Sequence, residues 1–217
     1  MKFVDYTNIN KEYEFKITKN NDIKNILFLD IDGVINTPET YIHIKENTPL
    51  NKEKYTLEEI MEMDVSEIDF CNNYEREYIN RLQKIIDTIP NTYICICSSN
   101  RQSHTHKYLE ELLKNYGLKN FKYLGATPVV IYPKEKEENI TIDLVDILNS
   151  NYEKKHCYRG EEVKYVLDYY NPKNYIILDD MSDYLEEQLE HFVKIKGWLG
   201  LQEEDVEKSI KILQKTY

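Results

Sequence analysis

Five short apolar runs, rich in β-branched and aromatic residues, divide the chain and predict five β-strands. Between them, apolar residues recur at three- and four-residue spacing, which is the pattern of amphipathic helices. The strands are expected at residues 26–30, 92–97, 121–124, 175–178 and 192–195, with one further short strand at 13–17. Helices are expected at residues 75–89, 108–116, 159–170 and 203–214.

This alternation of strands and helices predicts the fold class. Strands separated by helices pair in parallel, with helices packed on both faces of the sheet. The sequence therefore predicts an α/β fold with a Rossmann-like, three-layer, doubly wound parallel sheet. Ligands of such sheets bind beyond the carboxyl ends of the strands.

The length of 217 residues suits a single domain, and we expect one over residues 1–217. Residues 37–72 depart from the alternation and are expected to form a small helical cap or flap. With 41% apolar and 31% charged residues the composition is that of a globular protein. No apolar run is long enough to span a bilayer, so we expect a cytoplasmic protein without a membrane partner.

Net charge and cysteine spacing limit the possible partners and the state of the thiols. The net charge of -11 repels polyanions, so any contact with nucleic acid is expected to be local. The four cysteines have no CxxC spacing and are expected to be free thiols. The oligomeric state does not follow from the sequence.

Polar side chains follow three of the predicted strands at their carboxyl ends. Asp30 and Asp32 follow the first strand, and Asp179 and Asp180 follow the fourth. Adjacent parallel strands lie about 4.8 Å apart, so these carboxylates would converge on one Mg²⁺, which prefers oxygen ligands. Gly33 allows the chain to turn sharply after the first pair. The second strand ends in polar groups suited to phosphate oxygens, from the residues Ser98, Ser99, Asn100 and Arg101.

The strand-end sequence Asp30-Ile31-Asp32-Gly33-Val34, the strand-end serine and Asp179-Asp180 resemble motifs I, II and IV of the haloacid dehalogenase (HAD) superfamily of Mg²⁺-dependent phosphatases. The similarity runs from about residue 25 to residue 213. Several further stretches resemble the HAD domain of RNA-repair proteins: Thr127-Pro128, Arg159-Gly160-Glu161-Glu162, the 175–180 strand, His191-Phe192-Val193 and Gly200-Leu201.

The resemblance implies a phosphoric monoester hydrolase that works through an aspartyl-phosphate. Asp30 would be the nucleophile and Asp32 the general acid and base. Mg²⁺ would be held by Asp30, the backbone carbonyl of Asp32, and Asp179 or Asp180. Ser98 would bind the phosphoryl group, and Arg159 would be the motif III cation that balances the carboxylates.

Some assignments stay open. Ser98 or Ser99 could be the motif II hydroxyl, because predicted strand ends shift by a residue or two. Lys154, Lys155 or Lys164 could replace Arg159 as the cation, although only four of the 28 basic residues are Arg. Asn100 stands where relatives often carry Trp. Ser99, Asn100, Arg101 and Gly33 are predicted to contact the substrate.

The substrate is expected to be a phosphomonoester of a nucleotide or a polynucleotide end. The predicted flap, with nine acidic and three basic residues, is a poor neighbour for a polyanion and favours a small phosphorylated metabolite instead. A catalytically silent HAD-fold binding module is a third reading, which the intact Asp30 and Asp32 disfavour. A metal-dependent glycosyltransferase would not need Ser98 and Asp179 in this order.

Overall fold

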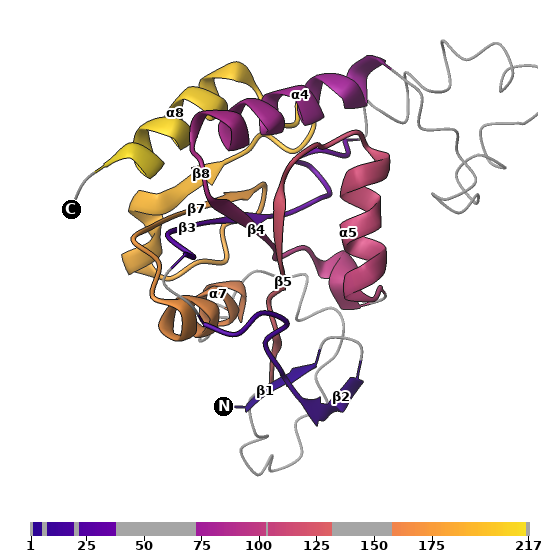
Figure 1. Ribbon diagram of the computed structural model, residues 1–217, viewed down its shortest axis with the longest axis vertical. Helices are drawn as coiled ribbons and strands as arrows, with labels where there is room; N and C mark the ends of the chain where they lie inside the picture. The colour runs from indigo at the N-terminus through magenta and orange to yellow at the C-terminus, as the bar shows by residue number, and fades with distance from the viewer. Residues whose placement is uncertain are drawn as a thin grey trace, which may run out of the picture.

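The computed structural model describes residues 2–5, 8–19, 22–37, 73–102, 104–131 and 158–215. Its centre is a five-stranded parallel sheet with the order β5-β4-β3-β7-β8 (Figure 1). These strands are β3 (Asn25–Leu29), β4 (Thr92–Ile96), β5 (Lys122–Ala126), β7 (Asn174–Asp179) and β8 (Phe192–Lys194). The five strands expected from the apolar runs are confirmed.

Helices cover both faces of this sheet, as Figure 1 shows for α4 and α8 on one side and α7 on the other. Side chains alternate along β3, so that Leu27 and Leu29 join the core under α4 and α8, while Ile26 and Phe28 join the core with α7. The three-layer Rossmann-like fold is therefore confirmed. The helices are α4 (Asn73–Thr88), α5 (His106–Asn115), α7 (Tyr158–Tyr170) and α8 (Glu203–Gln214).

The prediction of a strand at residues 13–17 is wrong. The N-terminal strands are β1 (Lys2–Asp5) and β2 (Asn8–Glu12), which form an antiparallel sheet with β6 (Val129–Ile131) in the order β2-β1-β6. Residues 13–17 dock through their side chains instead: Tyr13 donates a hydrogen bond of 2.6 Å to the carbonyl of Ala126, and Phe15 stacks on Tyr169. Their aromatic content reflects packing on α7 rather than strand pairing.

Two expectations fall outside the described residues. The predicted flap lies there except for Thr37, which is buried. Lys154 and Lys155 lie there as well. In the described segments, no helix combines the length and apolar character that crossing a membrane requires.

Candidate active site

The register of the sheet places Asp30 beside Asp179. Leu29 pairs with Leu178, and the backbone N–H of Asp30 donates a hydrogen bond of 2.9 Å to the carbonyl of Leu178. Asp180 joins them, and ligand oxygens of the three carboxylates lie within 4.8 Å of one another. The expected convergence of the two acidic strand ends therefore occurs.

Arg159, in the first turn of α7, bridges two of these carboxylates. Its Nη1 donates a hydrogen bond of 3.0 Å to Asp30 Oδ2 and a second, shorter one to Asp179 Oδ2. The start of the helix is fixed by a hydrogen bond of 2.9 Å from Gly160 N–H to the carbonyl of Asp183. Arg159 thus takes the position expected for the balancing cation, while Lys164 pairs with Asp168 on the surface.

Asp179 is fully buried and held from two further directions. Its Oδ1 accepts a hydrogen bond of 2.6 Å from the N–H of Met181, and its Oδ2 accepts one from the Tyr184 hydroxyl. Burial and the neighbouring Asp30 raise the pKa of Asp179 to about 6. The site therefore holds more negative charge than its single guanidinium balances.

Tyr184 was not found by sequence reasoning. It is 5% exposed and contacts both Asp179 and the Cys97 thiol, which lies 3.8 Å away. Its segment has no regular periodicity, so nothing in the sequence marks it as part of the site. Burial also raises the pKa of Cys97 well above its usual value, so this free cysteine lines the site as a neutral thiol.

Two glycines enclose the Asp180 side chain. A Cβ at Gly33, where φ is +76°, would lie 2.6 Å from Asp180 Cγ, and a Cβ at Gly197 would lie 2.5 Å from Asp180 Oδ2. Any side chain at either position would displace the carboxylate. Gly33, predicted as a substrate contact, is thus explained here by its approach to Asp180. Gly197 was not identified from the sequence, because it lies in the turn after β8 and not next to either acidic motif.

Asp32 differs from the other carboxylates because it is exposed. Its Oδ1 accepts a hydrogen bond of 3.0 Å from Asn36 Nδ2, and the N–H of Gly33 donates one of 2.6 Å to the carbonyl of Asn36. The tight turn leaves this carboxylate exposed to solvent two residues after Asp30. Such a position suits proton exchange with substrate and water.

The end of β4 separates the two candidate serines. Ser98 is completely buried directly after Cys97, whose N–H bonds to the carbonyl of Leu29 on the neighbouring strand. Ser99 is exposed and begins the 3-10 helix η2 (Ser99–Gln102). The side chain of Asn100 lies outside the description.

The structure corrects the interpretation of Arg101, which we expected at a substrate phosphate or on the surface. Its side chain is buried, and its guanidinium donates to the carbonyls of Cys97 and Ser98 and to the Glu162 carboxylate. Two further donors bond to the carbonyls of Thr127 and Pro128, so all of its hydrogen-bonding directions are used internally. Arg101 cross-links the interior behind the site.

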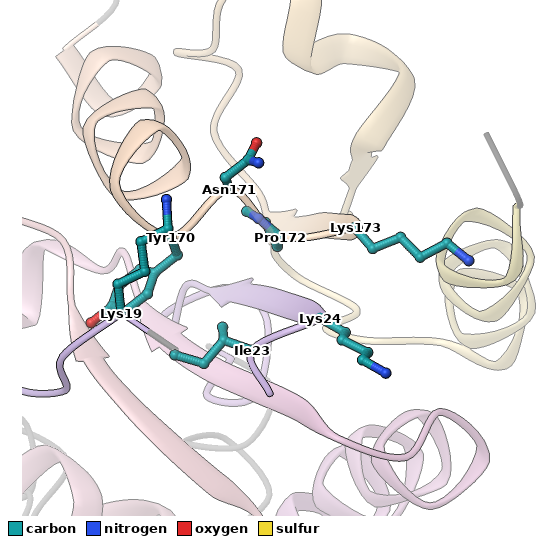
Figure 2. Close-up of a pocket in the computed structure, with 7 residues that line it drawn as sticks. All are labelled: Lys19, Ile23, Lys24, Tyr170, Asn171, Pro172 and Lys173. Atoms are coloured by element: carbon teal, nitrogen blue, oxygen red, sulfur yellow. The ribbon is translucent and has the colours of Figure 1, made fainter. Parts of the chain in front are cut away.

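The pocket drawn in Figure 2 lies at the other end of the sheet. It encloses about 320 Å³ near Lys24 and Lys173, the residues that precede β3 and β7. The acidic cluster follows the carboxyl ends of the same two strands. Because parallel strands have all their amino ends at one edge, this pocket is not part of the candidate site.

An acidic cluster bridged by an arginine, at the carboxyl ends of a parallel Rossmann-like sheet, is the arrangement that the resemblance to the HAD superfamily predicts. The chain belongs to the family described as the HAD domain in Swiss Army Knife RNA repair proteins, which it matches over residues 26–206. This span contains every residue of the cluster, and membership implies a phosphohydrolase-type function. Neither the curated proteins nor the solved structures contained a match.

Proposed function

We propose that this chain is a Mg²⁺-dependent phosphomonoesterase that forms an aspartyl-phosphate on Asp30. The observation that carries the proposal is the convergence of Asp30, Asp179 and Asp180 around the guanidinium of Arg159. A phosphoryl group needs a nucleophile, a counter-charge and a proton donor within reach of one point. This end of the sheet supplies all three, with Asp32 as the donor.

The donor set fits Mg²⁺. Three carboxylates face the Arg159 guanidinium and the Lys194 ammonium beside Asp180, so a bound cation would neutralise the remaining negative charge, and oxygen ligands are the ones that Mg²⁺ prefers. Asp30, Asp180 or Asp179, and the backbone carbonyl of Asp32 are the proposed ligands. When bound, the ion would lower the repulsion between the carboxylates and the phosphoryl oxygens.

The reaction then follows from the positions of the two motif I carboxylates. A carboxylate oxygen of Asp30 forms a bond to phosphorus while the bond to the leaving oxygen breaks, and Asp32 gives its proton to that oxygen. In the second step Asp32 removes a proton from water, which attacks phosphorus and releases Asp30. Arg159 holds the Asp30 carboxylate in place through its hydrogen bond of 3.0 Å.

Ser98 is the proposed hydroxyl for the transferring phosphoryl group, and exposed Ser99 is a proposed substrate contact. Ser98 is buried just beyond the end of β4, and the pairing of Leu29 with Ile96 brings Asp30 level with Cys97, the residue before Ser98. Arg101 supports this position from behind by donating a hydrogen bond of 2.6 Å to the Ser98 carbonyl. The burial of Ser98 favours it over Ser99 as the motif II residue.

We propose a phosphomonoester on a nucleotide or polynucleotide end as the substrate, because the matching family is described from RNA repair proteins. Salt dependence separates this from a small metabolite. For single strands, log K falls with log salt by about 0.7 per neutralised phosphate. A phosphorylated oligonucleotide should therefore bind better than its mononucleotide at low salt and lose the advantage as salt rises. Equal binding at every salt concentration would favour the metabolite.

The decisive experiment is release of phosphate from a generic aryl phosphate, with Mg²⁺ and with a chelator. We expect turnover only with Mg²⁺, and loss of more than about a thousandfold in Asp30→Asn. The matched control is Asp87→Asn, an exposed carboxylate on α4 that bonds Gln83. Residual activity within about tenfold of wild type would remove Asp30 from the nucleophile role, and binding of phosphate without turnover would favour the silent module.

A further inference from the structure

Three exposed apolar residues are next in sequence to residues of the acidic cluster or to residues that touch it. In the described segments six large hydrophobic side chains are exposed, and three of them adjoin the site along the chain. Tyr158 precedes Arg159, Met181 follows Asp180, and Trp198 follows the glycine that touches Asp180. Trp198 is the most exposed of the six, at 66%.

Trp198 lies in a hydrogen-bonded turn that follows β8. Two backbone N–H groups, of Leu199 and Gly200, close the turn with hydrogen bonds of 2.8 and 3.0 Å to the carbonyl of Lys196. Gly197 lies so close to Asp180 that a Cβ there would overlap its carboxylate at 2.5 Å. Trp198 is therefore separated from the Asp180 carboxylate by a single residue, Gly197.

Most of the surface of Trp198 is not packed against the rest of the described fold. Burying an aromatic side chain removes roughly 150–250 Å² from water and is strongly favourable, so an exposed tryptophan indicates a surface that a ligand covers. Base stacking on an aromatic side chain typically changes affinity by between about fivefold and about a hundredfold. A platform of this kind beside a phosphoryl site suits a ligand that carries a phosphate and a planar ring together.

We propose that Trp198, assisted by Met181, is a platform that stacks on the nucleobase of the substrate. This rests on the proposed phosphomonoesterase function and adds a determinant of specificity to it. The phosphoryl group would lie at Asp30 and Arg159, and the nucleoside would extend over the rim. A sugar phosphate without a base would reach the same acidic cluster but gain nothing from the indole.

The first test uses fluorescence, because Trp198 is the only tryptophan of the chain. The wild-type protein with Mg²⁺ is mixed in a stopped flow with adenosine monophosphate or ribose 5-phosphate and read before turnover. Excitation where tyrosine does not absorb isolates the indole, and a free tryptophan analogue corrects for absorption by adenine. We expect saturable quenching by the nucleotide and none by ribose 5-phosphate.

The second test uses the ratio of kcat/KM for the nucleotide to kcat/KM for ribose 5-phosphate. Trp198→Ala should lower this ratio by about tenfold or more, mainly through the KM for the nucleotide, and Trp198→Phe should restore part of it. The control is Leu189→Ala. Leu189 is also an exposed hydrophobic residue, but it lies on η3 (Glu186–His191), which precedes the amino end of β8. It should leave the ratio unchanged.

The outcomes separate the platform from the phosphatase itself. Hydrolysis of both phosphates without quenching, and with an unchanged ratio in Trp198→Ala, would overturn the platform and leave the phosphatase function standing. Saturable quenching by the nucleotide without hydrolysis would support the platform and contradict the phosphatase. Absence of both would overturn both and point to another occupant, such as a partner protein, for the exposed indole.

Discussion

The guanidinium of Arg101 and the carboxylate of Glu162 form a buried ion pair between η2 and α7. The pair reaches a third element, because Glu162 Oε1 also accepts a hydrogen bond of 3.2 Å from the N–H of Val130 in β6. Arg159 lies three residues earlier in the same helix. The ion pair therefore fixes the helix that carries the guanidinium of the acidic cluster.

Glu162→Gln should destabilise the protein, because it leaves the Arg101 guanidinium buried without a counter-charge. Removal of one partner of a buried pair costs about 3–5 kcal/mol, whereas an exposed pair costs less than about 1 kcal/mol. Glu77→Gln, which removes an exposed partner of Arg81, is the matched control. Denaturant unfolding measures both.

The double substitution Arg101→Met with Glu162→Met should cost less than the sum of the two single ones, because no charge is left unpaired. If Glu162→Gln changed stability by less than about 1 kcal/mol and Arg101→Met instead raised KM, a role for Arg101 at the substrate would be restored.

Arg159→Met should destabilise the metal-free protein by about 3 kcal/mol, because Asp30 and Asp179 would then repel each other without a cation between them. Mg²⁺ should recover more stability in this variant than in the wild type, since a bound ion replaces the missing charge. Lys164→Met, which removes a surface pair in the same helix, is the control. Thermal unfolding across a Mg²⁺ titration gives the comparison, and an equal Mg²⁺ response in all three proteins would contradict the prediction.

The pKa of Asp179, raised to about 6 by burial and by Asp30, predicts a pH dependence of stability in the metal-free protein. The folded state binds the proton more tightly than the unfolded chain, so the contribution is complete below about pH 4 and is lost as pH rises to about 6. Asp179→Asn should remove this loss, which we expect to be about 1–3 kcal/mol. Mg²⁺ should also suppress it by favouring the carboxylate.

The measurement is the difference between the unfolding free energies of wild type and Asp179→Asn with pH, in a chelator. Carboxylates outside the acidic cluster titrate in both proteins and cancel in the difference. A difference that does not change between about pH 4 and about pH 7 would show that Asp179 ionises normally.

Asp32→Asn should slow hydrolysis more for a substrate with a poor leaving group than for an activated aryl phosphate, which needs little protonation. We expect a difference between the two losses of about a hundredfold. Because Asp32 is exposed, the fold should be intact by circular dichroism. Equal losses on both substrates would make Asp32 a ligand or a structural residue instead.

The strands of the central sheet and the acidic residues at its carboxyl edge could be predicted from the amino-acid sequence. Short apolar runs between helical patterns, such as those of β3 and β7, predict buried parallel strands, and the acids that follow such strands lie at one edge of the sheet. The convergence of Asp30, Asp179 and Asp180 and the position of Arg159 at a helix start could therefore be predicted. The spacing of apolar residues predicts the strands and helices, and the parallel direction of the strands places their carboxyl ends at one edge.

The contacts made by irregular segments, and by side chains that join separate elements, could not be predicted from the sequence. Arg101 points inward because it pairs with the buried Glu162 carboxylate, which is 61 residues away in the sequence. Tyr184 contacts Asp179 from a segment without helical or strand periodicity. The antiparallel pairing of β1 with β6 likewise joins distant segments. Such contacts depend on the packing of complete elements in space, and neighbouring residues in a sequence carry no signal for them.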